Sequence, residues 1–441
     1  MLPKFILNYF LLFLITTILS SCDTFIGVSE GPPLPGKRIS ILAKEKKLSA
    51  EIESDLREIL LPPPTPNNSW PQSGGYANHA MHHIKVDSSL EELWSTDIGS
   101  GTDDSELLFA PPILAGKTIY TMDAENQIIA TNADTGNELW SKELENDEDE
   151  HHISGGLAYS EGNLYITTGW GEVICLDSNS GKVKWKKNFG LPMRTPPTIW
   201  RGRIFVITVT NKLLVLNSSD GEELWSHQSI DETTTILGGA SPAVDNGVVV
   251  VAYSSGELAA LKVENGQQLW SDVLSSSGGA GSSTKLSAIK ARPVIDRGLV
   301  FAMSNQDLLV SIDIRTGRRV WTKPFGGIGN PWVAGNLVYV ISSSYELVAL
   351  SRKTGDIYWV KTLNDFYKTK KQHKNLIWTG PILVSDRLLV ANTKGHILSI
   401  SPYSGEILGN IKLSDGLTVP PIAALNTVYF LTEDADLIAY R

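Results

Sequence analysis

Five histidines stand in two clusters, and these clusters carry the residue type that a metal site would need. His79, His82 and His83 fall in the phrase His-Ala-Met-His-His, whereas His151 and His152 follow an acidic run. Zinc sites combine imidazole nitrogens with cysteines or carboxylates at regular spacing, commonly on a helix or hairpin. Neither cluster has a cysteine or a helical period beside it. The sequence therefore predicts polar surface histidines and no metal site.

Motifs for covalent or phosphate chemistry are absent from the sequence, which has no Gly-x-Ser-x-Gly elbow and no phosphate loop. The chain has 2 cysteines, Cys22 and Cys175. A single thiol beyond Cys22 leaves no internal disulfide. Cys175 stands in the apolar phrase Val-Ile-Cys-Leu-Asp, where a cysteine packs as a small buried hydrophobe. We therefore predict no catalytic residues, no cofactor and no enzymatic activity.

Cys22 has a different context, because it ends a secretory signal. Lys4 precedes an apolar run that extends to Leu19, and two serines lead to Cys22. The run is shorter than the roughly 20 residues that span a bilayer. The tetrad Leu-Ser-Ser-Cys fits the bacterial lipobox, in which the thiol receives a diacylglyceryl group and becomes the mature N-terminus. We predict a signal peptide over residues 1–21 and lipidation at Cys22; the alternative is a cleaved signal followed by an incidental cysteine.

The acyl chains predicted at Cys22 would hold the mature protein on a membrane. Asp23, directly after the lipidated position, leaves the choice of membrane open. In enteric-type bacteria an aspartate there marks retention in the inner membrane, but bacterial lineages differ. We expect the periplasmic side of the outer membrane, with the inner membrane as the alternative.

The charge balance excludes one class of partner. The formal net charge is −10, so acidic residues outnumber basic ones. Nucleic-acid binding rests on clustered lysine and arginine contacts to phosphates. We therefore predict no nucleic-acid partner.

A repeated phrase organises the rest of the chain. Each copy is an apolar strand, a polar turn that ends in glycine, and a short strand that carries tryptophan four residues after the glycine. Asp-Thr-Gly and Asp-Gly turns between alternating apolar runs are strong hairpin signals, because glycine accepts the positive φ that the turn requires. The spacing of 38 to 51 residues matches the propeller-blade range of roughly 40–50 residues. The turn glycines are Gly136, Gly181, Gly221, Gly266, Gly317, Gly355 and Gly405, and in the last copy Gly409 replaces the tryptophan.

The ends of the chain give the number of blades. Two further strands precede each phrase, so one unit has four strands, and units must stack radially to bury their faces. The last unit has three strands and no glycine turn, whereas a tryptophan-bearing strand around Trp94 precedes the first unit. That strand would complete the last unit and remove the open sheet edges. The sequence predicts an all-β fold: an eight-bladed β-propeller over residues 86–441, closed by an N-terminal strand, with a tryptophan covering the gap between neighbouring blades.

Residues 22–85 do not fit the repeat and contain a polyproline stretch, so we predict a lipidated, partly disordered tether. Three loops between blades are long: the acidic run 145–150, the Ser/Gly run 275–284 and the basic run 368–374. Loops of this kind are usually solvated, and a partner contact at each stays open.

The phrase Ala-x-Asp-x-x-Thr-Gly-x-x-x-Trp resembles the repeat of quinoprotein propellers, which include quinone-dependent dehydrogenases and non-enzymatic lipoproteins. With the lipobox and eight blades, the chain resembles the BamB family of the outer-membrane β-barrel assembly machinery. Two phrases before the propeller, at 33–42 and 70–75, are similar to those of α-proteobacterial members. The resemblance implies a scaffold that binds the periplasmic POTRA domains of BamA, works with the other lipoproteins of the complex, and aids the insertion of unfolded barrel precursors.

The resemblance also implies a contact segment, which reads Leu-x-Leu-Arg in the family and lies just before the third blade. The matching residues are Leu191, Met193 and Arg194, with methionine in place of the second leucine. A second family contact uses two aspartates before the fifth blade, where this chain has Ala288 and Lys290. This departure leaves the second contact in doubt.

Two other functions stay open at the level of sequence. A generic periplasmic adaptor for another membrane complex is supported by Asp23. A dehydrogenase that uses pyrroloquinoline quinone is less favoured, because such enzymes carry adjacent cysteines beside the cofactor and acidic or asparagine ligands for calcium. This chain has no cysteine pair.

Overall fold

The protein is described here by a computed structural model. The structure describes residues 48–441 except for 53–58, 104–106, 145–152, 231–238, 275–287, 306–307, 328, 368–372 and 374. The chain divides at Leu48, and residues Leu48–Arg441 form one compact unit. The signal peptide, Cys22 and Asp23 therefore lie outside the described residues, as do the acidic loop and the Ser/Gly loop.

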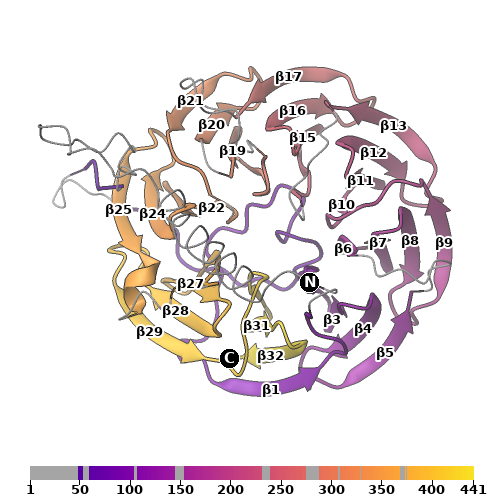
Figure 1. The fold of residues 1–441 in the computed structure, drawn as a ribbon, viewed down its shortest axis with the longest axis horizontal. Coiled ribbons are helices and arrows are strands. Elements are labelled where there is room, and N and C mark those ends of the chain that lie inside the picture. Colours follow the sequence, from indigo (N-terminus) through magenta and orange to yellow (C-terminus); the bar gives the residue numbers. More distant parts are fainter. Residues whose placement is uncertain are drawn as a thin grey trace, which may run out of the picture. The chain divides into compact units, whose positions relative to one another are not determined.

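The described strands form eight sheets of four strands each, arranged as blades around a central axis (Figure 1). Within each blade the strands are antiparallel neighbours, from the axis outward. The first four sheets, each given from its innermost to its outermost strand, are β2(Ile113–Ala115) β3(Thr118–Met122) β4(Gln127–Asn132) β5(Glu138–Glu143); β6(Gly156–Ser160) β7(Asn163–Thr167) β8(Glu172–Asp177) β9(Val183–Asn188); β10(Thr198–Trp200) β11(Arg203–Ile207) β12(Lys212–Asn217) β13(Glu223–Gln228); and β14(Ala243–Asp245) β15(Val248–Ala252) β16(Glu257–Lys262) β17(Gln268–Val273). The other four sheets are β18(Val294–Asp296) β19(Leu299–Met303) β20(Leu309–Asp313) β21(Arg319–Lys323); β22(Trp332–Ala334) β23(Leu337–Ile341) β24(Glu346–Ser351) β25(Ile357–Thr362); β26(Trp378–Val384) β27(Arg387–Asn392) β28(His396–Ile400) β29(Ile407–Lys412); and β30(Ile422–Ala424) β31(Thr427–Leu431) β32(Asp436–Tyr440) with β1(Glu92–Asp97). The prediction of an eight-bladed, all-β propeller is confirmed.

The predicted closure of the ring is also confirmed. β1 lies at the outer edge of the last blade and pairs antiparallel with β32, so that Trp94 is opposite Ala439 and Asp97 is opposite Asp436. The N-terminal and C-terminal strands thus complete one sheet, and every blade has its full four strands.

The tryptophans of the outer strands join neighbouring blades, as the repeat predicts. Trp140 of β5 donates its Nε1–H to the carbonyl oxygen of Ser178 in the next blade, at 3.1 Å. The same contact recurs around the ring at Trp94, Trp185, Trp225, Trp270, Trp321 and Trp359, each with a carbonyl of the following blade. Each indole therefore covers apolar surface between two blades while its polar N–H has a partner.

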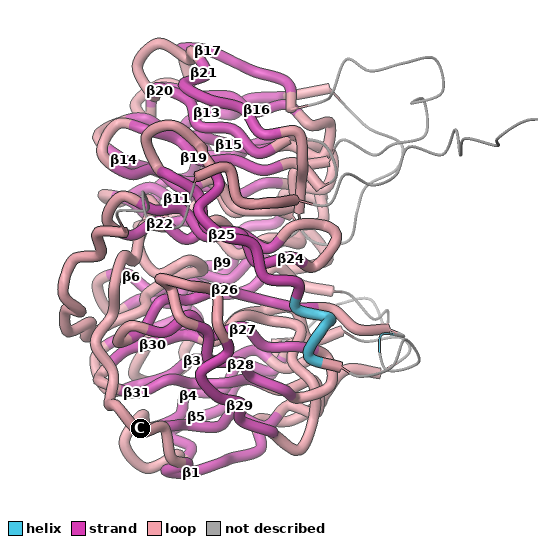
Figure 2. Tube along the Cα trace, turned by 90° about the vertical axis from the view of Figure 1, so that its left-hand side faces the viewer, coloured by secondary structure: helices cyan, strands magenta, loops and turns pink. Residues whose placement is uncertain are grey.

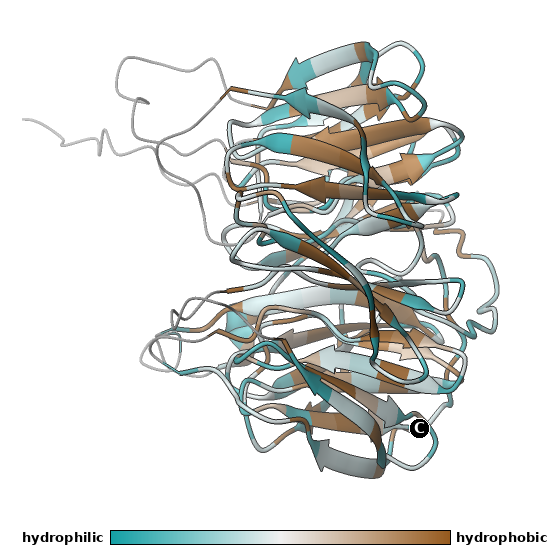
Figure 3. Cartoon of the chain, turned by 90° about the vertical axis from the view of Figure 1, so that its right-hand side faces the viewer, coloured by the Kyte–Doolittle hydropathy of each residue, from teal (hydrophilic) through white to brown (hydrophobic). Residues whose placement is uncertain are grey.

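The interior of each blade follows from strand alternation and stacking. The two middle strands are apolar on both faces, because each face packs against a neighbouring blade, and residues such as Val215 and Leu350 are fully buried. The outer strands alternate between exposed and half-buried residues. Figure 3 shows the apolar colour in the middle of the blades and the hydrophilic colour at many outer strands and turns.

Regular structure besides strands is sparse in the described residues. One 3-10 helix, η3(Leu363–Phe366), follows β25 and is the coloured helical segment in Figure 2. Among the described residues, no helix has the length and apolar character needed to cross a bilayer.

Residues 59–86 form a collar on one face of the propeller, the face of the turns between the first and second strands of each blade. The collar is the purple trace inside the ring of blades in Figure 1. Its backbone pairs with inner strands. The Trp70 N–H donates to the Leu114 carbonyl at 2.7 Å, and the Leu114 N–H donates to the Trp70 carbonyl at 2.8 Å. Ile84 forms a parallel bridge with blade seven, where its N–H donates to Leu383 and its carbonyl accepts from Ser385.

The collar contacts the inner part of each blade in turn. The bonded collar residues are Asn67 (blade eight), Trp70 (one), Pro71 (two), Gln72 (three), Ala77 (four), Asn78 (five), His82 (six) and Ile84 (seven). Inner strands are sheet edges, so their free N–H and C=O groups need partners when they are buried. Residues 59–85, which the sequence places in the tether, thus lie against the propeller.

Candidate functional site

The contact segment predicted at 191–194 is a loop that enters the third blade at its axis. Met193 is fully buried, in a core cluster with Val173, Cys175 and Ile199. The Met193 N–H donates to the Thr168 carbonyl at 3.0 Å. Leu191 and Arg194, on either side, are half-buried. The loop is therefore fastened from beneath by Met193, while its two neighbours are in part accessible.

Arg194 lies at the central channel, on the face opposite the collar. It lines a cavity of about 40 Å³ among blades three, four and five and a second cavity of about 220 Å³ on the axis. Its Nε atom is buried and has no hydrogen-bond partner among the described residues. The guanidinium group of Arg194 can donate hydrogen bonds to a ligand group that accepts them.

The positions of the second family contact lie at the same place. Ala288 and Lys290 precede the fifth blade, and both line the 40 Å³ cavity with Arg194. Lys290 also lines the axial cavity. Two loops that are far apart in the sequence therefore meet at one mouth of the channel, although the aspartates of the family pattern are missing.

The electrostatic character of this mouth is basic. Burial lowers the pKa of Lys290, whose Nζ atom lies 5.8 Å from the ring centre of Phe109. Burial also lowers the pKa of Arg292, a third cation of the axial cavity, to about 10. No aspartate or glutamate is among the described residues that line either cavity. The arrangement suits a ligand that brings negative charge.

The first histidine cluster differs from the prediction of polar surface residues. His79 and His83 are buried in the collar, with relative exposures of 6% and 1%. His79 Nδ1 donates to the Pro293 carbonyl at 2.8 Å, and burial lowers the pKa of His79 to about 3. His82 is more exposed and lies 3.6 Å from Asp296. The sequence around these histidines has no strand or helix period that would predict burial. They are buried by blades that are far away in the sequence.

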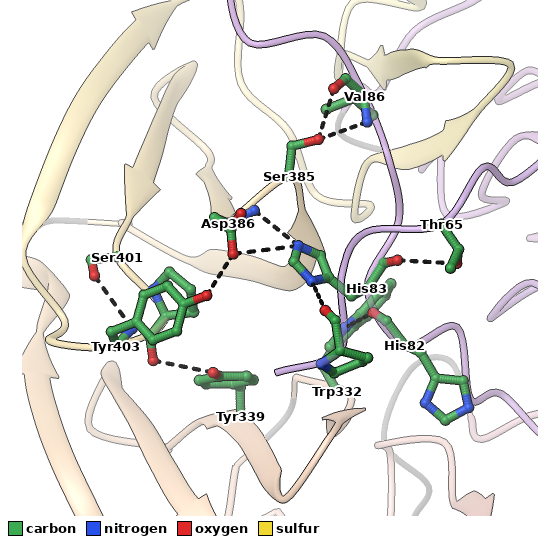
Figure 4. A network of polar contacts seen from close by, with 12 residues as sticks. Thr65, His82, His83, Val86, Trp332, Tyr339, Ser385, Asp386, Ser401 and Tyr403 are labelled. Carbon is green, nitrogen blue, oxygen red and sulfur yellow. Dashed lines mark hydrogen bonds and ion pairs between the residues drawn. The ribbon is translucent and has the colours of Figure 1, made fainter. Parts of the chain in front are cut away.

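His83 links the collar to the seventh blade (Figure 4). Its Nδ1–H donates to the Pro62 carbonyl at 2.7 Å, and its Nε2 accepts the Asp386 backbone N–H at 2.9 Å. The Asp386 carboxylate accepts in turn from Tyr403 at 2.6 Å. Both ring nitrogens of a neutral imidazole are thus satisfied, which makes His83 a structural residue and not a free ligand.

The part of the chain that the structure describes contains no cluster of metal ligands and no accessible thiol. No group of three or more histidine, cysteine, aspartate or glutamate side chains is placed there to hold a metal ion. His151 and His152 lie outside the described residues. Cys175 is buried at 1% exposure, and burial raises the pKa of its thiol to about 11.

Comparison with known proteins assigns this propeller to a family. The family model described as outer membrane protein assembly factor BamB matches residues 82–156 and 124–361. The chain belongs to the BamB family. The resemblance inferred from the repeat is thereby confirmed, together with the quinoprotein-like repeat.

Relatives in the BamB family are similar over most of the chain. Outer membrane protein assembly factor BamB of Escherichia coli is 28% identical over 339 residues, which cover 75% of this chain and 83% of that protein. The Yersinia pestis protein of the same name is 25% identical over 80% of this chain and 89% of its own length. An uncharacterized protein of Rickettsia prowazekii is 27% identical over 74% of this chain and 81% of its own.

Solved structures show the same fold. The crystal structure of BamB from Moraxella catarrhalis has a TM-score of 0.67 at 20% identity, over 80% of this chain and 100% of that one. A quinohemoprotein alcohol dehydrogenase from Comamonas testosteroni has a TM-score of 0.66 at 12% identity, over 84% of this chain and 80% of that one. At these identities the likeness shows the propeller fold and carries no activity across.

Proposed function

We propose that this chain is a non-catalytic scaffold of the outer-membrane β-barrel assembly complex. In this role it binds the POTRA domains of BamA, sits beside the other lipoproteins of the complex, and aids the insertion of unfolded barrel precursors. Membership of the BamB family supports the role in outer membrane protein assembly. The observation that carries the partner site is the convergence of the loops before blades three and five on one mouth of the channel.

The three predicted contact residues take different parts in this proposal. Leu191 and Arg194 are the contact residues, because both are in part accessible. An apolar side chain beside an arginine is a common composition of interface hot spots. Met193 is a positioning residue, since its side chain is fully buried and its backbone N–H holds the loop to Thr168.

The proposal includes a lipid anchor at Cys22 and a place on the periplasmic side of the outer membrane. The support is the lipobox and the names of the relatives, which are outer membrane protein assembly factors. The tether then consists of residues 22–47, because Glu51 and residues 59–85 are bonded to the propeller. A Cys22→Ser variant tests the anchor: it should leave the membrane fraction, and retention at the wild-type level would contradict the anchor.

A generic periplasmic adaptor is the second candidate, because Asp23 follows the lipidated position. It uses the same channel mouth but a different complex, held at the inner membrane. Separation of inner and outer membranes by density distinguishes the two: the assembly scaffold should be found with the outer membrane.

The experiment that tests the main proposal is a titration of the full chain, in nonionic detergent, with the isolated POTRA domains of BamA. An Arg194→Glu variant removes one charged contact and adds repulsion, which should cost about 2–5 kcal/mol of binding free energy. Arg201→Glu is the matched control, since Arg201 is an exposed arginine of the same blade in the turn on the collar face. Binding that resists Arg194→Glu discards the site, and no binding at all discards the partner.

A further inference from the structure

We propose that the axial cavity is a binding site for the carboxylates of an acidic peptide segment that also carries apolar side chains. This inference rests on the channel mouth of the proposed function and adds the chemistry of the segment that the mouth binds. It rests on how charge and apolar side chains are distributed around the walls of the channel.

The basic wall is built by repetition. In most blades a proline directly precedes the innermost strand, and the residues one and three positions before that proline point to the axial cavity. Blades three and five carry cations at the outer of these positions, Arg194 and Lys290, and blade four between them carries Gly239. Gly239 adds no side chain, so the two cations flank a gap. Arg292, one position before its proline, adds a third positive charge deeper in the channel.

The charges on this wall have few partners, and one of them is the ring of Phe109, whose centre lies 5.8 Å from Lys290 Nζ. Arg292 donates to the Ser73 hydroxyl of the collar, and its Nε atom is buried without a partner among the described residues. The Arg194 Nε atom is likewise buried without a hydrogen-bond partner among the described residues. No described residue forms an ion pair with Arg194, Lys290 or Arg292. Partly buried cations without a carboxylate partner are favoured by an anion beside them, because desolvation without compensation costs several kcal/mol.

The opposite wall is apolar. Blades seven, eight and one contribute Trp378, Val419 and Phe109 to the same cavity, with no charged side chain. A free inorganic anion would leave this wall unused. A peptide that has carboxylates on one side and apolar groups on the other matches both walls.

The size of the cavity favours a segment inserted from outside. Its volume is about 220 Å³, below the roughly 300–1,000 Å³ of clefts that enclose a whole small-molecule ligand. The adjoining 40 Å³ cavity is lined by Arg194, Lys290 and the polar side chains of Thr208 and Ser254, and it has room for one carboxylate group. A few side chains of a longer partner fit this space.

The test is a calorimetric titration of the full chain in nonionic detergent with a tetrapeptide of alternating glutamate and phenylalanine. The lysine–phenylalanine tetrapeptide is the charge control, and citrate is the small-carboxylate arm. The glutamate peptide should bind, more weakly as salt screens the charges, and the lysine peptide should not. Lys290→Gln should weaken binding roughly tenfold or more, which is the loss expected when a buried charged contact is removed.

Lys117→Gln is the matched control variant, because Lys117 lies in a turn on the collar face and pairs with Asp134. It should bind the glutamate peptide as the wild type does. Arg194→Gln gives a second test if the Lys290 variant folds poorly. Binding of citrate without the peptide overturns the peptide segment in favour of a small anion. Equal binding of both tetrapeptides, or binding unaffected by Lys290→Gln and Arg194→Gln, overturns the site.

Discussion

The indole of Trp225 in blade three lies directly against Gly266 in the turn of blade four. A Cβ atom built on Gly266 would be 2.5 Å from Trp225 Cε3, closer than real carbon atoms approach. The same pairing of turn glycine and preceding tryptophan recurs at Gly136, Gly181, Gly221, Gly317, Gly355 and Gly405. Each glycine thus serves the turn and the junction between blades.

The junction between blades seven and eight lacks this pair for a reason visible in the topology. Blade eight takes its outer strand from the N-terminus, so it has no hairpin turn and no turn glycine. Gly409 stands where blade seven would carry tryptophan, and a Cβ there would meet no atom within 4 Å. The missing tryptophan and the missing turn glycine thus fall at the same junction.

Replacing Gly266 by alanine should destabilise the propeller by more than backbone strain alone. The Gly266→Ala variant combines a positive φ of 73° with the overlap on Trp225, and we expect a loss of about 2–4 kcal/mol. Gly247→Ala is the control, since Gly247 has a φ of 80° and open space at its Cβ position. Urea unfolding of both variants measures the difference; equal losses would show that the contact with Trp225 adds nothing.

The contact loop should separate stability from binding. Met193→Ala removes a fully buried side chain and should lower the free energy of unfolding by about 2–5 kcal/mol. Leu191→Ala, at a half-buried position, should lower it by less, yet weaken binding to POTRA domains. Thermal unfolding and calorimetry on both variants check this. The reverse order of effects would place the contact elsewhere.

The collar should respond to the loss of one side-chain acceptor. Gln72 Oε1 accepts the backbone N–H of Ile199 at 2.7 Å, and both groups are buried. Gln72→Ala leaves that N–H without a partner, at a cost of about 1–3 kcal/mol. Hydrogen exchange at Ile199 should accelerate, while exchange at Leu350, in the middle strand of blade six, should not. Unchanged protection of Ile199 would mean that the collar is not needed there.

Acid should destabilise the protein through His79. Its pKa is lowered to about 3 in the folded state from 6.5, so below pH 6.5 the unfolded state binds a proton that the folded state does not. The stabilisation is complete above pH 6.5 and declines by up to about 1.4 kcal/mol per pH unit as the pH falls toward 3. His79→Asn suits the left-handed backbone at φ 62° and removes the titrating group. The variant should show a shallower decline in urea unfolding between pH 6 and pH 4; an equal slope would exclude His79 as the cause.

Cys175 should be inert toward thiol reagents in the folded protein. It is 1% exposed, and burial holds its pKa at about 11, so little thiolate forms near neutral pH. A Cys22→Ser chain should react with an aromatic disulfide reagent only after unfolding. Rapid reaction of the native chain would indicate that blade two opens locally.

The sequence by itself determined the number of blades, the turns and the closure of the ring. These features follow from local signals: a glycine that accepts positive φ, a tryptophan four residues later, and a strand around Trp94 that matches the gap left after β32. Each repeat carries the same signal, so the assignment of a blade with a weak signal is supported by its neighbours in the repeat.

The tertiary structure alone decided the collar and the charged channel. The segment around His79 and His83 has no strand or helix period, and its partners are inner-strand groups from all eight blades. Arg194, Lys290 and Arg292 look like isolated loop cations in the sequence, and they share one cavity only because the ring brings the ends of different blades to a common axis. Local pattern specifies an element, whereas the closure of the ring specifies which distant side chains meet.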